Sequence, residues 1–206
     1  MSLTLQERYL KAKIPKRFWG ITLDDYTTEG PHGEGVKRAI GEYMDNLTDN
    51  LERGVGMTLM GPPGSGKTML ANLIAKAAVE KGYTTMYLPI ARYMHWLTNL
   101  IAWRDAQDAE TQMAWAKMRQ TTQAVKSKIK FLILDDVGKE HVTETKFAED
   151  EFDYMIRLRY DYGLPTIMTS NLTLDKWAGA YKAQMESFIH EASPVLEVAT
   201  EDYRKR

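Results

Sequence analysis

Short apolar runs alternate with amphipathic stretches along most of the chain. Apolar residues recur at helical spacing from Val36 to Leu51, and an Ala- and Leu-rich stretch from Thr68 to Lys81 has the same character. Further helices are expected over 145–160 and, as one helix or two, over 90–125. The apolar runs that fit buried strands cover residues 56–60, 84–88, 130–134, 166–170 and 195–199. This alternation predicts a three-layer α/β fold in which helices cover both faces of a parallel sheet.

The two ends of the chain depart from this pattern. The first 20 residues are basic, and three glycines and one proline in residues 29–35 predict a loop. Residues 1–35 are therefore interpreted as a basic lead-in and loop, and residues 36–206 as the main domain. The stretch after Asn171 is short for a full helical lid, so a reduced C-terminal lid is expected.

Composition excludes several kinds of chemistry. The chain of 206 residues fits one domain, and its net charge of -1 gives no argument for or against nucleic acid. The absence of cysteine excludes disulfides, thiolate zinc sites and a cysteine nucleophile, and the 4 histidines lack metal-ligand spacing. No apolar run has the length of about 20 residues that a membrane span needs, and the charged start is unlike a signal peptide. A cytoplasmic protein without a membrane partner is therefore expected.

The segment GPPGSGKT, residues 61–68, fits the pattern G-x-x-x-x-G-K-[ST] and lies between an expected strand and an expected helix. Glycines let backbone N–H groups converge on phosphate oxygens, Lys67 adds positive charge, and Thr68 offers a hydroxyl to Mg²⁺. The alternative is a glycine-rich turn without a ligand, which the strand–loop–helix context disfavours. Nucleotide binding is predicted for Gly61, Pro62, Pro63, Gly64, Ser65, Gly66, Lys67, Thr68 and Met69.

Two carboxylates end the apolar run at 131–134, at the sheet edge where open α/β sheets bind ligands. Asp135 is placed to hold Mg²⁺, directly or through water, and Asp136 to orient or deprotonate an attacking water. Glu140 either supports or replaces Asp136, or is a solvated loop acid. Asn171 ends the apolar run at 166–170, where its amide could sense the γ-phosphate or the water, or could simply close a turn.

Together these segments resemble a known family. GPPGSGKT, FLILDDVG with Glu140, and PTIMTSN followed by leucine resemble the P-loop, Walker B and sensor-1 segments of the AAA+ ATPases of the DnaC/DnaI helicase-loader and IstB transposition-helper group. Residues 14–26 and 202–204 resemble that group's lead-in and ending. The resemblance implies a P-loop NTPase fold, ATP and Mg²⁺ as cofactors, and homo-oligomers on DNA or ATP. It also implies a replicative helicase and single-stranded DNA as partners.

The chain departs from the usual pattern of this group in its arginines. Members of this group usually carry arginines soon after sensor 1, as a finger or as sensor 2, whereas residues 181–188 contain none. An arginine finger contributes about 10³–10⁵ in rate, so hydrolysis is expected to be slow. Arg157 and Arg159 are possible substitutes, and the alternative is that both are exposed helix arginines. The group's larger loaders also have an N-terminal helicase-gripping domain, where this chain has only its basic lead-in.

The region between the second expected strand and Asp135 is the candidate DNA surface. Tyr93, Trp96, Leu100 and Trp103 form one helical stripe, which is more typical of a core than of a nucleic-acid platform. The following basic stretch fits single-stranded DNA, with a solvated helix face as the alternative. Its cations are Lys117, Arg119, Lys126, Lys128 and Lys130.

The leading functional hypothesis is a compact AAA+ helicase loader, whose size suggests a phage origin. It would hydrolyse ATP slowly and use the nucleotide state to hold or release single-stranded DNA and a helicase. An IstB-like transposition helper is the first alternative. A catalytically weak adaptor or helicase inhibitor is the second, and a small-molecule P-loop kinase is disfavoured because the chain has a second Walker B acid and a sensor asparagine.

Overall fold

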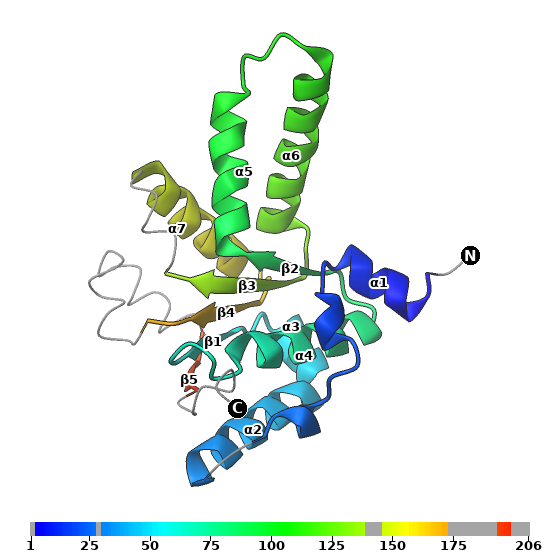
Figure 1. Cartoon of the computed structure of the whole chain (residues 1–206), viewed down its shortest axis with the longest axis vertical. Coiled ribbons are helices and arrows are strands. Elements are labelled where there is room, and N and C mark those ends of the chain that lie inside the picture. Colours follow the sequence, from blue (N-terminus) through cyan, green and yellow to red (C-terminus); the bar gives the residue numbers. More distant parts are fainter. Residues whose placement is uncertain (1–2, 28–29, 139–145, 173–192, 199–206) are drawn as a thin grey trace.

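Within the described residues, five parallel strands form the centre of the molecule, in the order β2-β3-β4-β1-β5 (Figure 1). The computed structural model describes residues 3–27, 30–138, 146–172 and 193–198. The strands are β1 (Met57–Met60), β2 (Thr85–Pro89), β3 (Phe131–Val137), β4 (Thr166–Ser170) and β5 (Val195–Glu197). The predicted parallel sheet is therefore confirmed, with β3 running three residues beyond its predicted end.

Helices pack on both faces of this sheet, as the alternating pattern predicted. One apolar core joins the sheet to α1 (Leu5–Lys11), α2 (Gly30–Asp45), α3 (Leu47–Glu52) and α4 (Lys67–Glu80). The other joins it to α5 (Ile90–Ala102), α6 (Ala109–Ser127) and α7 (Lys146–Asp161). Successive side chains of β3 alternate between these cores, so that Ile133 faces the first and Leu134 the second.

The expected loop over 29–35 is wrong for residues 30–35, because α2 begins at Gly30. A proline is tolerated in the first turn of a helix, where its missing N–H has no intrahelical partner. Burial of Val36 and Ile40 supplies the packing that favours the helix despite the glycines. The predicted 36–51 helix is instead divided at Asn46 into α2 and α3.

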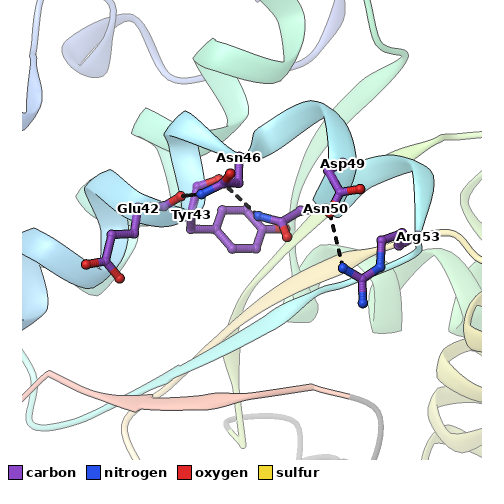
Figure 2. Close-up of polar contacts among 6 residues, drawn as sticks. All are labelled: Glu42, Tyr43, Asn46, Asp49, Asn50 and Arg53. Atoms are coloured by element: carbon purple, nitrogen blue, oxygen red, sulfur yellow. Dashed lines mark hydrogen bonds and ion pairs between the residues drawn. The ribbon is translucent and has the colours of Figure 1, made fainter.

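Polar side chains stabilise this break, which Figure 2 shows. The Asn46 Nδ2 atom donates to the carbonyl of Glu42 at 2.9 Å, and the Asn50 Nδ2 atom donates to the carbonyl of Tyr43 at 3.1 Å. These side-chain amides thus bind carbonyls in the last turn of α2, where intrahelical donors run out, and the Glu42 carbonyl also accepts from the Asn46 backbone amide at 3.2 Å. The Arg53–Asp49 pair is exposed and adds little.

The basic lead-in packs against the sheet and α4. Tyr9, Ile14, Phe18 and Tyr26 are buried in the same apolar core as α4. Two short 3₁₀ turns, η1 (Lys16–Phe18) and η2 (Leu23–Asp25), follow α1. The backbone of the lead-in also meets the edge of the sheet, because the Tyr87 amide of β2 donates to the Ala12 carbonyl at 2.8 Å.

Helices α5 and α6 form a hairpin that extends away from the sheet in Figure 1. Tyr93 of the aromatic stripe is fully buried, and Trp96 and Leu100 pack against the same core. The Trp115 indole N–H donates to the Leu100 carbonyl at 2.9 Å and joins the two helices. The core interpretation of the stripe is confirmed for these residues. Within the part of the chain that is described, no helix is both long and apolar enough to cross a bilayer.

Candidate functional site

The glycine-rich loop connects β1 to α4 at the carboxyl edge of the sheet. Gly64 and Gly66 have φ values of 83° and 90°, which a residue with a side chain adopts only at a cost. Helix α4 begins directly after them at Lys67. The N–H groups of the first helical turn and the positive dipole end of the helix therefore face the loop, as an anion site requires.

The Lys67 ammonium lies over this loop. Its Nζ atom donates to the Gly61 carbonyl at 2.8 Å, the Pro62 carbonyl at 2.7 Å and the Ser65 Oγ atom at 3.2 Å. These acceptors are neutral, whereas a phosphate would offer charged oxygens and a stronger hydrogen bond. The side chain is long enough to exchange one set of partners for the other.

The Asp135 carboxylate of β3 accepts hydrogen bonds from side chains of α4, β4 and β2. Its Oδ1 atom accepts from the Thr68 hydroxyl at 2.9 Å and from the Thr169 hydroxyl at 2.6 Å. Its Oδ2 atom accepts from the Tyr87 hydroxyl at 2.6 Å. Asp135 is only 4% exposed, so these donors replace the water that the carboxylate loses. The predicted convergence of the loop and the Walker B acid is therefore present.

Asp136 has an unusual backbone that the sequence did not indicate. Its φ is 64°, and the pairing of β3 with β4 shifts register between Leu134 and Val137. Aspartate tolerates this left-handed region better than most residues, at a cost of about 1–3 kcal/mol. The Asp136 amide donates to the Thr169 hydroxyl at 2.9 Å, and the Asn171 Nδ2 atom donates to the Asp136 Oδ1 atom at 3.3 Å. The irregular strand thus brings the second acid beside the expected sensor.

Tyr87 and Thr169 belong to the site, although sequence reasoning missed them. Both lie near the carboxyl ends of strands that the pattern had identified, which is the signal that could have found them. Burial, with the Asp135 carboxylate as the second cause, raises the pKa of Tyr87 well above its usual value. Tyr87 therefore stays protonated near neutral pH and donates to Asp135.

Of the remaining predicted site residues, Met69 is described by the structure and Glu140 is not. Met69 follows Thr68 in the first turn of α4 and is half-buried. Glu140 lies outside the described residues, as do residues 181–188 and 202–204 and most of the expected C-terminal lid.

The five candidate DNA-binding cations are placed differently from one another. Lys126 is buried and its Nζ atom lies 2.6 Å from the Glu151 carboxylate, and the Lys130 Nζ atom donates to the Gly163 carbonyl at 2.9 Å. Both ammonium groups thus have partners within the fold, and Lys130 is half-buried. Lys117, Arg119 and Lys128 are exposed, and the Arg119 guanidinium lies 5.3 Å from the centre of the Trp115 ring.

Arg159 is neither exposed nor placed to act as a finger. It is 1% exposed, and its guanidinium donates to the Thr166 hydroxyl and to backbone carbonyls at the end of α6 and the starts of β3 and β4. Burial lowers the pKa of Arg159 to about 9, so it remains charged at neutral pH. Arg157 is partly exposed, and its Nε atom lies 2.8 Å from the Asp153 Oδ1 atom.

Comparisons with known proteins agree with this geometry. A family model described as IstB-like ATP binding protein matches residues 44–206. The ATP-binding protein of insertion sequence IS21 from Pseudomonas aeruginosa is 26% identical over 208 residues, which cover 97% of this chain and 69% of that protein. The replicative helicase loader DnaI of Bacillus subtilis is 30% identical over 164 residues, 79% of this chain and 48% of that protein. The chain thus spans about half the length of DnaI.

A solved structure is also similar. The crystal structure of the DnaC helicase loader matches with a TM-score of 0.71 and 26% identity, covering 89% of this chain and 99% of that one.

Proposed function

The chain belongs to the IstB-like ATP-binding protein family, and from that premise we propose that it is a magnesium-dependent ATPase that acts on DNA as a nucleotide-controlled switch. Its fold is the AAA+ type of P-loop NTPase fold that the resemblance implied. The observation that carries the proposal is the 2.9 Å hydrogen bond between Thr68 and Asp135, because it joins the phosphate loop to the Walker B acid. Turnover of ATP by the purified chain, with and without Mg²⁺, is the direct test.

The residues present fit a magnesium-bound triphosphate. Loop amides and the start of α4 would bind phosphate oxygens, and Lys67 would add charge at the terminal phosphates. Thr68 and Asp135 supply the hydroxyl and carboxylate oxygens that Mg²⁺ prefers, and Mg²⁺ needs few protein ligands because it keeps several waters. Bound Mg²⁺ would neutralise charge that develops on the transferred phosphate.

Asp136 is proposed to act on the attacking water, and Asn171 to sense the bound nucleotide. Asp136 would orient the attacking water or accept its proton, and Asn171 would bind the γ-phosphate or that water while it keeps Asp136 in position. The sequence suggested Arg157 and Arg159 as arginine-finger candidates. Because Arg159 is buried, only Arg157 of these two remains a candidate. Hydrolysis by the isolated chain is therefore expected to be slow.

The biological role proposed first is that of a replicative helicase loader that assembles into homo-oligomers on DNA or ATP. DnaI, which is named as a loader, and the DnaC structure support it. The second candidate is a transposition helper, which the IS21 protein and the family model favour. Co-purification with a hexameric replicative helicase would support the loader, whereas filaments on duplex DNA would support the helper.

Single-stranded DNA binding is expected to depend on Arg119 and Lys128. Each phosphate contact steepens the salt dependence, so the double variant Arg119→Ala/Lys128→Ala is expected to reduce the slope of log K against log[salt] by about 1.4. Fluorescence anisotropy with a labelled oligothymidine across a salt series measures this slope. Arg38, exposed on α2, provides the matched control Arg38→Ala. An unchanged slope in the double variant would place DNA on another surface.

Tyr87 is proposed to position the Asp135 carboxylate for magnesium. Residues that hold a metal ligand in place typically change metal affinity by about 10–100-fold, so Tyr87→Phe is expected to raise the Mg²⁺ concentration for half-maximal turnover by roughly tenfold. A magnesium titration of ATP hydrolysis measures this shift, with Tyr83→Phe as the control. An equal shift in both variants, or none in Tyr87→Phe, would contradict the positioning role.

A further inference from the structure

A large groove lies away from the nucleotide site, between α1, the segment that joins α4 to β2, and α6. We call it the amino-terminal groove, and its volume is about 930 Å³. Aliphatic side chains from four parts of the chain contribute to its surface: Ala12, Val79, Met86 and Ile129. An apolar surface of this kind favours occupation by apolar side chains of another molecule.

The charged residues that line the groove all have the same sign. They are Arg8, Lys11, Lys13 and Lys117, and among the described residues no carboxylate lines it. Burial lowers the pKa of Lys13, and the neighbouring charges of Arg92 and Lys117 lower it further. Like charges gathered beside an apolar surface repel one another, and an anionic partner would relieve that repulsion.

Lys13 is held in this position by its backbone and by an aromatic ring. Its φ is 59°, in the left-handed region that non-glycine residues seldom adopt. The Lys13 amide donates to the Leu10 carbonyl at 3.0 Å, and its Nζ atom lies 4.7 Å from the centre of the Trp96 ring. The fold thus maintains a strained residue whose ammonium is half-buried among other cations.

Exposed leucines distinguish the type of partner. Leu3 lines the groove and is 50% exposed. Leu5 and Leu10 of the same amino-terminal segment, outside the groove lining, are 42% and 53% exposed. A nucleic-acid strand needs aromatic platforms more than leucines, and Tyr83 is the one aromatic residue among the described groove residues. Leucines and an aliphatic floor beside cations complement a protein segment that carries apolar and acidic side chains.

We propose that the amino-terminal groove docks an acidic amphipathic segment of a partner protein. Apolar side chains of that segment contact the groove floor, and its carboxylates pair with Lys13, Lys117 and the cations of α1. This docking surface goes beyond the proposed ATPase and involves none of the residues assigned to the nucleotide.

The test uses the full chain and a defined probe, a fluorescein-labelled 16-residue helical peptide with leucine on one face and glutamate elsewhere. Fluorescence anisotropy is expected to show saturable binding. Lys13→Glu/Lys117→Glu is expected to weaken it at least tenfold, and Lys13→Gln/Lys117→Gln to weaken it less. The control Arg38→Glu reverses an exposed charge on α2 and is expected to leave binding unchanged.

Several results would overturn the proposal. One is equal binding of a matched peptide with lysine in place of glutamate, and another is peptide binding that neither double variant alters. Absence of peptide binding would also overturn it, and oligothymidine binding that these variants abolish would then assign the groove to nucleic acid. ATP binding, measured on the same samples, is expected to be intact in every variant, so failure here is distinct from failure of the ATPase proposal.

Discussion

Asp136→Asn is expected to lower ATP turnover by about 10²–10⁴-fold, the contribution typical of a general base, while ATP affinity stays within about threefold. The substitution removes the carboxylate but keeps its size. Asparagine also tolerates the left-handed backbone at this position. Its amide oxygen can still accept the hydrogen bond that Asn171 donates to Asp136 Oδ1. The change therefore acts on proton transfer and charge rather than on the fold of the site.

Single-turnover hydrolysis and fluorescent-nucleotide titration separate these two effects. Asp161→Asn, at the exposed end of α7, is the matched control and is expected to hydrolyse ATP like the unmodified chain. Unchanged turnover in Asp136→Asn would remove Asp136 from the mechanism. A parallel loss of ATP affinity would instead assign it to nucleotide binding.

Arg159→Ala is expected to lower the free energy of unfolding by about 3–5 kcal/mol, because each buried acceptor that loses its donor costs about 1–3 kcal/mol and the lost side chain leaves a cavity. The guanidinium donates to the carbonyls of Val125 and Ile129 at 2.6 and 3.0 Å and to that of Pro165 at 3.1 Å. Its loss removes this donor from the Val125 and Ile129 carbonyls and leaves a cavity between α6, α7 and the sheet, whereas the Pro165 carbonyl still accepts from the Leu132 amide at 3.3 Å. Because β3 and β4 carry Asp135 and Thr169, the loss also weakens the support of the site.

Urea unfolding followed by circular dichroism measures this change. Arg157→Ala is the matched control from the same helix, and its partly exposed pair with Asp153 is expected to contribute less than about 1 kcal/mol. Equal destabilisation by the two substitutions would contradict the structural role of Arg159.

The strands and the site's main residues could be predicted because their signals are local. Each buried strand is a short apolar run, and residues 61–68 combine glycines, lysine and threonine at the spacing that phosphate binding requires. The meeting of Thr68 with Asp135 follows from parallel topology, which brings the carboxyl ends of β1 and β3 to one edge of the sheet, on either side of β4.

Other features depend on tertiary contacts that have no local signal. Residues 30–35 are helical because α2 packs against the apolar core. The glycines and the proline in this stretch do not reveal that packing. In the sequence, Lys126 and Arg159 cannot be distinguished from exposed cations. In the fold, Lys126 pairs with Glu151, and Arg159 donates to a set of backbone carbonyls. The left-handed backbone of Asp136 likewise follows from the register shift in β3.

Isothermal titration of the chain with ATP and Mg²⁺ tests most directly whether Gly61–Thr68 and Asp135 form one nucleotide site. We expect one ATP per chain, and we expect Lys67→Ala to weaken binding at least about 30-fold through the loss of a charged hydrogen bond to phosphate. Lys81→Ala, exposed at the end of α4, is expected to bind as the unmodified chain does. Absence of heat at millimolar ATP, or equal affinity in Lys67→Ala, would contradict the account.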